Sequence, residues 1–257
     1  ITVTDETTGK SYRADVVGTD ASDDVAVLKL RNASDLTTAE VGDASDVSDL
    51  GVGDTVTGVG NGGGTGTLTQ ASGKVTALEK SITATDESGQ NAERLTGLIQ
   101  TNAPIVAGDS GGPLYDADGD IVGIDTAASA QNGSNTASVA YAIPIDDAMK
   151  VVDQIESGVE TSSVQIGLPA FIGVGISQTT TGGAGVTSVL DGGPADKAGI
   201  TAGSVITAVG GKSVTSGDSL KTRLGAYDPG ERVTITWTDT SGATQSATVT
   251  LAEGPAA

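Results

Sequence analysis

The segment TNAPIVAGDSGGPLYDADGDIVGIDTA, Thr101 to Ala127, decides how this chain is interpreted. Ser110 stands between glycines in GDSGGPL, so the backbone can form a tight turn that exposes the hydroxyl oxygen. The same turn can direct the backbone N–H groups of Gly108 and Ser110 at one point. Two such donors stabilise the negative charge that develops when a carbonyl group is attacked. The alternative interpretation is a glycine-rich hairpin turn without chemistry.

The chain contains no histidine, although a serine nucleophile needs a base and the usual base is an imidazole. Either catalysis is lost or the histidine lies outside these 257 residues. Without histidine and cysteine only oxygen ligands remain, and we expect no metal and no cofactor. The segments GGKS and GNGGGTG lack the sequence context of phosphate-binding and dinucleotide-binding loops.

The composition favours strands and turns over helices, because Thr, Val, Gly and Asp dominate. Aromatic residues make up only 2% of the chain, so aliphatic side chains must build the core. The formal net charge of −20 argues against a nucleic-acid partner and against an anionic membrane surface. The sequence has no apolar run of about 18 residues, the length that a membrane-spanning helix needs.

Short apolar runs separated by turn residues occur across 1–30 and 54–143, which predicts a β-barrel or β-sandwich. An apolar stripe of helical period follows, made of Ile145, Ala148, Val151, Val152 and Ile155. The polar segment VETSSVQ then predicts a domain boundary, with one domain over 1–160 and a second over 164–257. In the second domain GPADKAG and SGDSLKTRLGAY are predicted to be short helices.

The first domain resembles the trypsin-like fold as used by the HtrA (Deg) family of bacterial proteases. IQTNAPIVAGDSGGPL is similar to that family's Q-T-[DN]-A-x-I-x-x-G-[ND]-S-G-G block. IVGIDTA and VAYAIPI resemble its VIGINTA and GFAIP strands, and VGTDASDDVAVLKL resembles the segment that carries its catalytic aspartate. The resemblance implies a mostly β protein: a trypsin-like double β-barrel, whose first barrel is incomplete in this chain, followed by a PDZ domain.

By this resemblance Ser110 is the nucleophile and Asp24 is the aspartate that orients the imidazole, with the adjacent Asp23 as the alternative. The amides of Gly108 and Ser110 form the oxyanion hole. The family's histidine motif, T-N-x-H-V, would precede Ile1, so we expect the base upstream of this chain.

The specificity pocket is predicted at Ile105, Ala140 and Tyr141, whose apolar character would favour small aliphatic substrate side chains. The alternative for each of them is an ordinary core residue. Asp109 departs from the family, which more often has Asn there, and it would need another partner or contact with solvent. The GNPFG-like loop reads GNGGG and therefore lacks its Pro and Phe.

The second domain resembles a PDZ domain through GGPADKAGITAGSVITAVGGKSV. Ile172, Gly173 and Val174 would turn backbone N–H groups toward a peptide C-terminus, and the strand after them would accept the peptide as an added strand. Leu220 and Leu224, one helical turn apart, would line the groove or else pack in the core.

The resemblance implies a serine endopeptidase that acts on unfolded or damaged proteins, in quality control in the cell envelope or outside the cell. Its partners would be unfolded polypeptides and C-terminal or apolar peptide segments. A homotrimer and a membrane anchor in a preceding segment are further implications. The alternatives are an inactive pseudoprotease that binds peptides through the PDZ domain, and an esterase. The chain by itself, without the base, should be inactive or nearly so.

Overall fold

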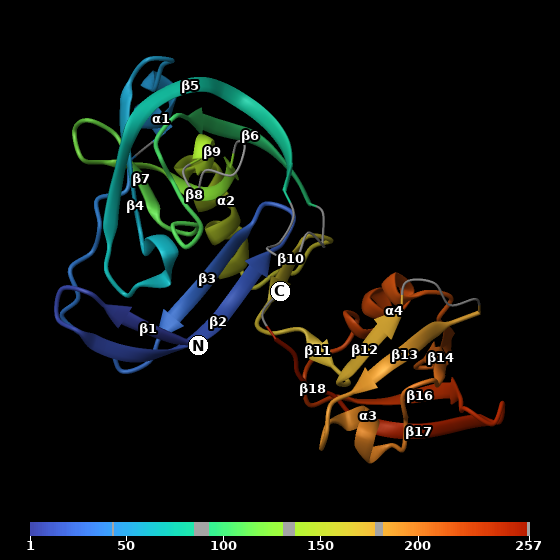
Figure 1. Ribbon diagram of the computed structural model, residues 1–257. Helices are drawn as coiled ribbons and strands as arrows, with labels where there is room; N and C mark the ends of the chain where they lie inside the picture. The colour runs from blue at the N-terminus through green and yellow to red at the C-terminus, as the bar shows by residue number, and fades with distance from the viewer. Residues whose placement is uncertain (43, 85–92, 131–136, 178–181, 256–257) are drawn as a thin grey trace. The chain divides into compact units, whose positions relative to one another are not determined.

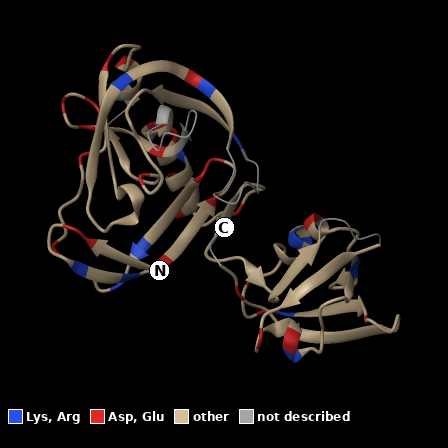
Figure 2. Ribbon diagram, in the orientation of Figure 1, with Lys and Arg blue, Asp and Glu red and all other residues tan. Residues whose placement is uncertain are grey.

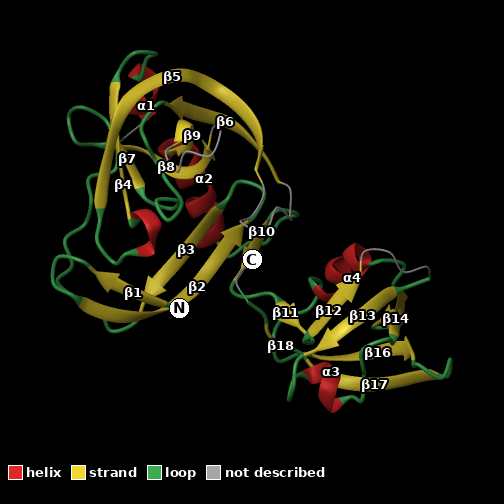
Figure 3. Ribbon diagram, viewed as in Figure 1, coloured by secondary structure: helices red, strands yellow, loops and turns green. Residues whose placement is uncertain are grey.

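The computed structural model of the chain describes residues 1–42, 44–84, 93–130, 137–177 and 182–255. These residues form two compact units, Ile1–Ile166 and Gly167–Ala257 (Figure 1). Both units are built mainly from antiparallel strands with few helices (Figure 3). The prediction of a mostly β protein is therefore confirmed.

The first unit begins with an antiparallel sheet. β1 (Thr2–Asp5), β2 (Lys10–Asp20) and β3 (Val25–Leu30) lie where the short apolar runs across 1–30 predict strands. A fourth strand, β10 (Val164–Ile166), comes from the other end of the unit and pairs with β2. The pairing of β10 brings the end of the first unit back to its beginning.

The second half of the first unit is a closed six-stranded barrel. Its strands, in the order of pairing, are β4 (Thr55–Gly60), β5 (Thr69–Ala84), β6 (Glu93–Thr101), β9 (Ala137–Pro144), β8 (Ile121–Ala130) and β7 (Pro113–Tyr115). Aliphatic side chains fill the barrel, among them Val56, Val75, Ile99, Leu114 and Val122, all at most 2% exposed. Closure of the barrel fixes the paired strands β7 and β8. The turn with Ser110, the candidate nucleophile, lies directly before β7.

Two α-helices belong to the first unit. α2 (Ile145–Glu156) buries four residues of the predicted stripe and leaves the fifth, Val152, partly exposed. Its contacts with β2, β3, β8, β9 and β10 join the two halves of the unit. α1 (Ala44–Asp49) lies in a polar segment that the sequence did not mark as helical. Six residues are too few for a helical period to show, and this helix is followed by Leu50, a buried core residue.

The second unit is a sheet with two short helices. Its strands pair in the order β12 (Val174–Ser177), β13 (Ala184–Val189), β14 (Val205–Val209), β16 (Arg232–Thr238) and β17 (Thr244–Thr250), with β15 (Lys212–Ser213) beside β14. A separate two-stranded sheet pairs β11 (Ala170–Phe171) with β18 (Ala252–Glu253). Both predicted helices are present, as α3 (Pro194–Lys197) and α4 (Gly217–Leu224).

Acidic residues outnumber basic ones by 33 to 13, and Figure 2 shows acidic positions on loops and turns in both units. A nucleic acid approaching these loops would meet negative charge. Among the described helices, none combines the length and the apolar character that crossing a bilayer requires.

Candidate active site

The turn that carries Ser110 depends on a glycine conformation. Gly108 has φ +98°, and a Cβ atom at this position would lie 2.5 Å from the carbonyl oxygen of Asn61. The next amide, that of Asp109, donates to the carbonyl of Val106 at 3.0 Å and closes the turn. Ser110 is left exposed at its end, as the glycine-flanked motif predicts.

Backbone hydrogen bonds attach this turn to β8. The amide of Gly111 donates to the carbonyl of Asp125 at 2.7 Å, and the amide of Asp125 donates to the carbonyl of Gly112 at 2.8 Å. The hydroxyl of Ser110 donates to the carbonyl of Thr126 at 3.1 Å. The position of the serine is thus set by two consecutive residues of β8.

Asp20 shapes the turn between β2 and β3. Its carboxylate is 2% exposed and accepts hydrogen bonds from the amide and hydroxyl of Ser22 at 3.0 and 2.6 Å, and from the hydroxyl of Ser163 at 2.7 Å. Burial works against the charge, but the hydrogen bonds from Ser22 and Ser163 outweigh it and hold the pKa of Asp20 below its ordinary value. The ionised carboxylate therefore fixes the backbone that leads to Asp24.

Asp24 is connected to the serine turn by hydrogen bonds through a single residue, Thr126. Asp24 has φ +56°, a left-handed conformation that aspartate tolerates better than most residues. In this conformation the Asp24 carboxylate accepts a hydrogen bond from the hydroxyl of Thr126. Thr126 therefore bonds to both Asp24 and Ser110, through its hydroxyl and its carbonyl respectively.

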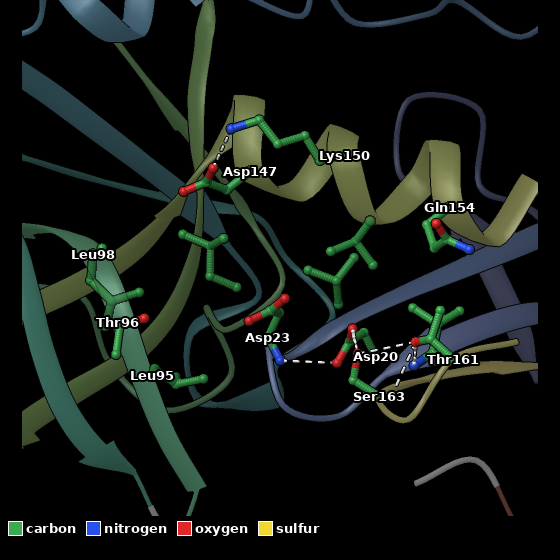
Figure 4. Close-up of a pocket in the computed structure, with 15 residues that line it drawn as sticks. Asp20, Asp23, Leu95, Thr96, Leu98, Asp147, Lys150, Gln154, Thr161 and Ser163 are labelled. Carbon is green, nitrogen blue, oxygen red and sulfur yellow. Dashed lines mark hydrogen bonds and ion pairs between the residues drawn. The ribbon is translucent and has the colours of Figure 1, made fainter.

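The neighbouring Asp23 points elsewhere. Figure 4 shows its carboxyl at a cavity of about 340 Å³, across from the Asp147–Lys150 ion pair of α2. Burial raises the pKa of Asp23, and the charges of Asp20 and Asp147 raise it further. Of the two adjacent acids, the structure places Asp24 on Thr126 and Asp23 in this cavity.

Thr126 is a residue of the site that its sequence context does not reveal. It lies in the IVGIDTA segment, which resembles a strand of the HtrA family. A hydroxyl residue in a strand gives no local signal, because strands contain many threonines for their β-propensity. Only the contacts with Asp24 and Ser110 distinguish it from the other threonines.

The two predicted oxyanion donors are the backbone amides of Gly108 and Ser110. Among the described residues, the amides of Gly108 and Ser110 donate no hydrogen bond to a protein acceptor. The GNGGG loop, which contains the short helix η1 (Gly62–Gly64), packs beside them, since the amide of Gly63 donates to the carbonyl of Ala107 at 2.8 Å.

The three predicted pocket residues do not form one group. Ile105 and Ala140 are 3% and 0% exposed and share a buried cluster with Ala71 and Ala103. Tyr141 packs against a different cluster, because consecutive residues of a strand point to opposite faces. The structure therefore brings Ile105 and Ala140 together and leaves Tyr141 outside their cluster.

Asp109 is buried, in contrast to the alternative of solvent contact. It is 4% exposed, and its Oδ2 accepts from the amide of Val106 at 2.9 Å. The second buried acid of the site is Asp125, which is 1% exposed. Burial raises the pKa of Asp125 to about 7, and the charge of Asp109 adds to this shift.

In the second unit, β12 is an edge strand of its sheet and follows the turn formed by Ile172 and Gly173. Gly173 has φ +79°, and no hydrogen bond donated by the Ile172 or Gly173 amide occurs in the described parts of the chain. Val174 begins β12. Leu220 and Leu224 are 2% and 8% exposed and belong to the core cluster of this unit, so they offer little surface to a ligand.

Comparison with known families finds two domains. Residues 2–124 match the trypsin-like peptidase domain, and residues 170–251 match the PDZ domain. These matches agree with the barrel and sheet described above, and they define a trypsin-like serine peptidase domain followed by a PDZ domain.

Individual proteins agree with this assignment. Serine protease PepD of Mycobacterium tuberculosis is 33% identical over 252 residues, which cover 95% of this chain and 52% of PepD. The periplasmic pH-dependent serine endoprotease DegQ of Escherichia coli is 34% identical over 232 residues, which cover 88% of this chain and 48% of DegQ. The structure of the HtrA-type protease AlgW with a tripeptide is 26% identical with a TM-score of 0.50, covering 97% of this chain and 80% of AlgW.

The chain combines a trypsin-like peptidase domain with a PDZ domain, and it is homologous over most of its length to HtrA serine proteases such as PepD and DegQ. It spans about half the length of the curated relatives that it matches. The family resemblance seen in the sequence is thus confirmed.

Proposed function

We propose that this chain forms the serine-bearing part of an HtrA-type endopeptidase that cleaves unfolded or damaged polypeptides. The observation that carries the proposal is the connection of Ser110 and Asp24 through Thr126. Acyl transfer requires a nucleophilic hydroxyl, hydrogen-bond donors for the oxyanion and a carboxylate that orients the base. The Ser110 turn supplies the exposed hydroxyl and two amides without a protein acceptor among the described residues, and Asp24 supplies the carboxylate.

In the proposed reaction Ser110 Oγ attacks the substrate carbonyl and forms an acyl-enzyme. A histidine from outside these 257 residues accepts the serine proton and then passes it to the leaving amine. Asp24 orients this imidazole and stabilises its charged form. The amides of Gly108 and Ser110 stabilise the oxyanion, and water then releases the acyl group. The Ser110 hydroxyl must turn from the Thr126 carbonyl toward the histidine before it reacts.

No specificity pocket is proposed at Ile105 and Ala140, because both side chains are buried in one cluster, 3% and 0% exposed, and offer little surface to a substrate. The second unit would bind peptide C-termini or apolar segments, with the Ile172–Gly173 amides receiving the carboxylate and the free edge of β12 receiving the peptide strand. The solved AlgW structures with a tripeptide and a decapeptide support peptide binding in this family.

DegQ and DegP are periplasmic, which supports a cell-envelope or extracellular location for this chain. A homotrimer and an anchor in a preceding segment remain predictions from the family resemblance.

The test is cleavage of unfolded casein by the full-length product of the gene. We expect cleavage by the wild type and none by Ser110→Ala, with Ser11→Ala, an exposed serine of β2, as the matched control. Equal rates for wild type and Ser110→Ala would remove Ser110 from the mechanism. If none of the three proteins cleaves casein, the proposal fails and the inactive peptide-binding alternative is favoured.

A further inference from the structure

Two buried carboxyl groups lie directly behind the candidate active site. Asp109 immediately precedes Ser110, and Asp125 immediately precedes Thr126. Their exposed fractions are 4% and 1%. The proposed acyl transfer uses neither carboxyl group, so their burial beside the serine calls for another explanation.

β4 provides the space for both carboxyl groups. A Cβ atom at Gly58 would lie 2.5 Å from Oδ2 of Asp125, and one at Gly60 would lie 2.6 Å from Oδ1 of Asp109. Gly58 and Gly60 are two residues apart, so they lie on the same face of the strand. The two glycines thus leave one face of β4 open for the two acids, in neighbouring positions.

Most of the carboxyl oxygens of this pair have no hydrogen-bond donor among the described residues. Oδ2 of Asp109 accepts from the amide of Val106, but Oδ1 of Asp109 and both oxygens of Asp125 have no partner among the described residues. A buried carboxylate without donors is unfavourable, because nothing replaces the water that it has lost. A protonated carboxyl group lowers this cost, since it carries no charge.

No cation faces the pair within the described parts of the chain. β4 contributes Gly58 and Gly60, β9 places Ala142 opposite Asp125, and the segment before the serine turn contributes Ile105 against Gly58. The described ion pairs of Arg31 and Lys150 join other aspartates: Arg31 pairs with Asp15, and Lys150 pairs with Asp146 and Asp147. The charged group that acts on Asp125 is therefore Asp109.

We propose that Asp109 and Asp125 retain one proton as a pair and that this proton keeps the Ser110 turn seated on β8. The backbone of Asp125 holds the turn through Gly111 and Gly112, so a displacement of Asp125 is passed directly to Ser110. A second negative charge in this site drives the two carboxylates apart and toward water. The consequence for peptidase activity rests on the proposed function, whereas the proton and the movement of the turn do not.

The pKa of about 7 for Asp125, caused first by burial and then by the charge of Asp109, places the change near neutral pH. The contribution of this proton to holding the turn is fully present below the unfolded-state pKa of 3.8 and is lost as the pH rises through about 7. The site would thereby lose its alignment in mildly alkaline solution without any change in Ser110 or Asp24.

Hydrogen–deuterium exchange tests the proposal on the 257-residue chain, read by mass spectrometry on peptides that cover 106–115. Rates at pH 5.5 and 8.5 are corrected for the intrinsic pH dependence of exchange. We expect protection of this segment to be about 30-fold lower at pH 8.5 than at pH 5.5, because pH 5.5 lies about 1.5 units below the pKa and the contribution of the proton is lost by pH 8.5. Asp125→Asn should abolish the difference, and Asp109→Asn should reduce it, because burial, the larger cause of the raised pKa of Asp125, remains in that variant.

Asp118→Asn is the matched control, because Asp118 is exposed in the turn between β7 and β8, and it should keep the wild-type response. The proposal is overturned if the wild type shows no pH-dependent change, or if both Asn variants respond as the wild type does. The hydrogen–deuterium exchange measurement requires neither the histidine base nor turnover of a substrate. A normal exchange response together with absent casein cleavage would therefore reject only the peptidase function.

Discussion

The hydroxyl of Thr126 donates a hydrogen bond to the carboxylate of Asp24, across 102 residues of sequence. The carbonyl of the same threonine accepts from Ser110, so one residue of β8 fixes the distance between the two halves of the site. Asp24 comes from the β2–β3 sheet, whereas Ser110 comes from the closed barrel. Their alignment therefore depends on how these two parts of the first unit pack together.

Removal of the Thr126 hydroxyl should impair catalysis without preventing folding. In the full-length protein we expect Thr126→Val to lower kcat by about 10-fold to 100-fold, because a hydrogen bond to a charged group contributes about 1.5 to 3 kcal/mol. KM should change little, and the acidic limb of the pH–rate profile should shift because Asp24 orients the base. Thr126→Ser keeps the hydroxyl and should restore the rate, and wild-type kinetics in the Val variant would contradict this role.

The close approach of β4 to the serine turn predicts a strong glycine requirement. A Cβ at Gly60 would lie 2.5 Å from the Cα atom of Asp109, a backbone atom that cannot move independently. We expect Gly60→Ala to lower the free energy of unfolding by about 1 to 3 kcal/mol, measured by urea denaturation. Gly51→Ala is the control, since its nearest atom would be 3.4 Å away, and a similar loss there would refute the steric explanation.

The hydrogen bonds of Asp20 should stabilise the first unit when the carboxyl group is ionised. We expect Asp20→Ala to lower the free energy of unfolding by about 1 to 3 kcal/mol at pH 7. Because the folded-state pKa is below 3.8, this contribution is present above that value and is lost as the pH falls through the folded-state pKa. Urea denaturation at pH 7 and pH 3 measures both effects, and an unchanged difference at the two pH values would contradict the assignment.

The raised pKa of Asp125 makes stability change with pH in the direction opposite to that of Asp20. Its contribution to stability is fully present below the unfolded-state value of 3.8 and is lost as the pH rises to about 7. The full change is on the order of 4 kcal/mol. We expect Asp125→Asn to be more stable than the wild type at pH 8, with little difference between the two at pH 4. Urea midpoints for the two proteins check this, with Asp118→Asn to account for general charge repulsion.

Peptide binding by the second unit should depend on the terminal carboxylate. Fluorescence titration of the whole chain with a peptide that ends in an apolar residue should give binding at least about 10-fold tighter than with the C-terminal amide, since one charge-assisted contact is lost. Gly173→Ala should weaken binding of the free acid, because φ +79° is strained for alanine. Equal affinities for acid and amide would exclude the Ile172–Gly173 turn as the carboxylate site.

The sequence alone determined the features that depend on local physics. Short apolar runs between turn residues predicted the strands across 1–30, helical periodicity predicted α2, and the glycines around Ser110 predicted its exposed turn. The family pattern supplied Asp24, and the structure then placed it beside the serine turn through Thr126. These features are readable because neighbouring residues in the chain impose them.

Tertiary structure decided the rest. The role of Thr126, the burial of Asp109 beside Asp125, and the separation of Tyr141 from Ile105 arise from contacts between strands distant in sequence. A hydroxyl or carboxyl group has the same local pattern in solvent and in a core. Its chemistry is set by the neighbours that packing provides, because burial and hydrogen-bond partners control both charge and position.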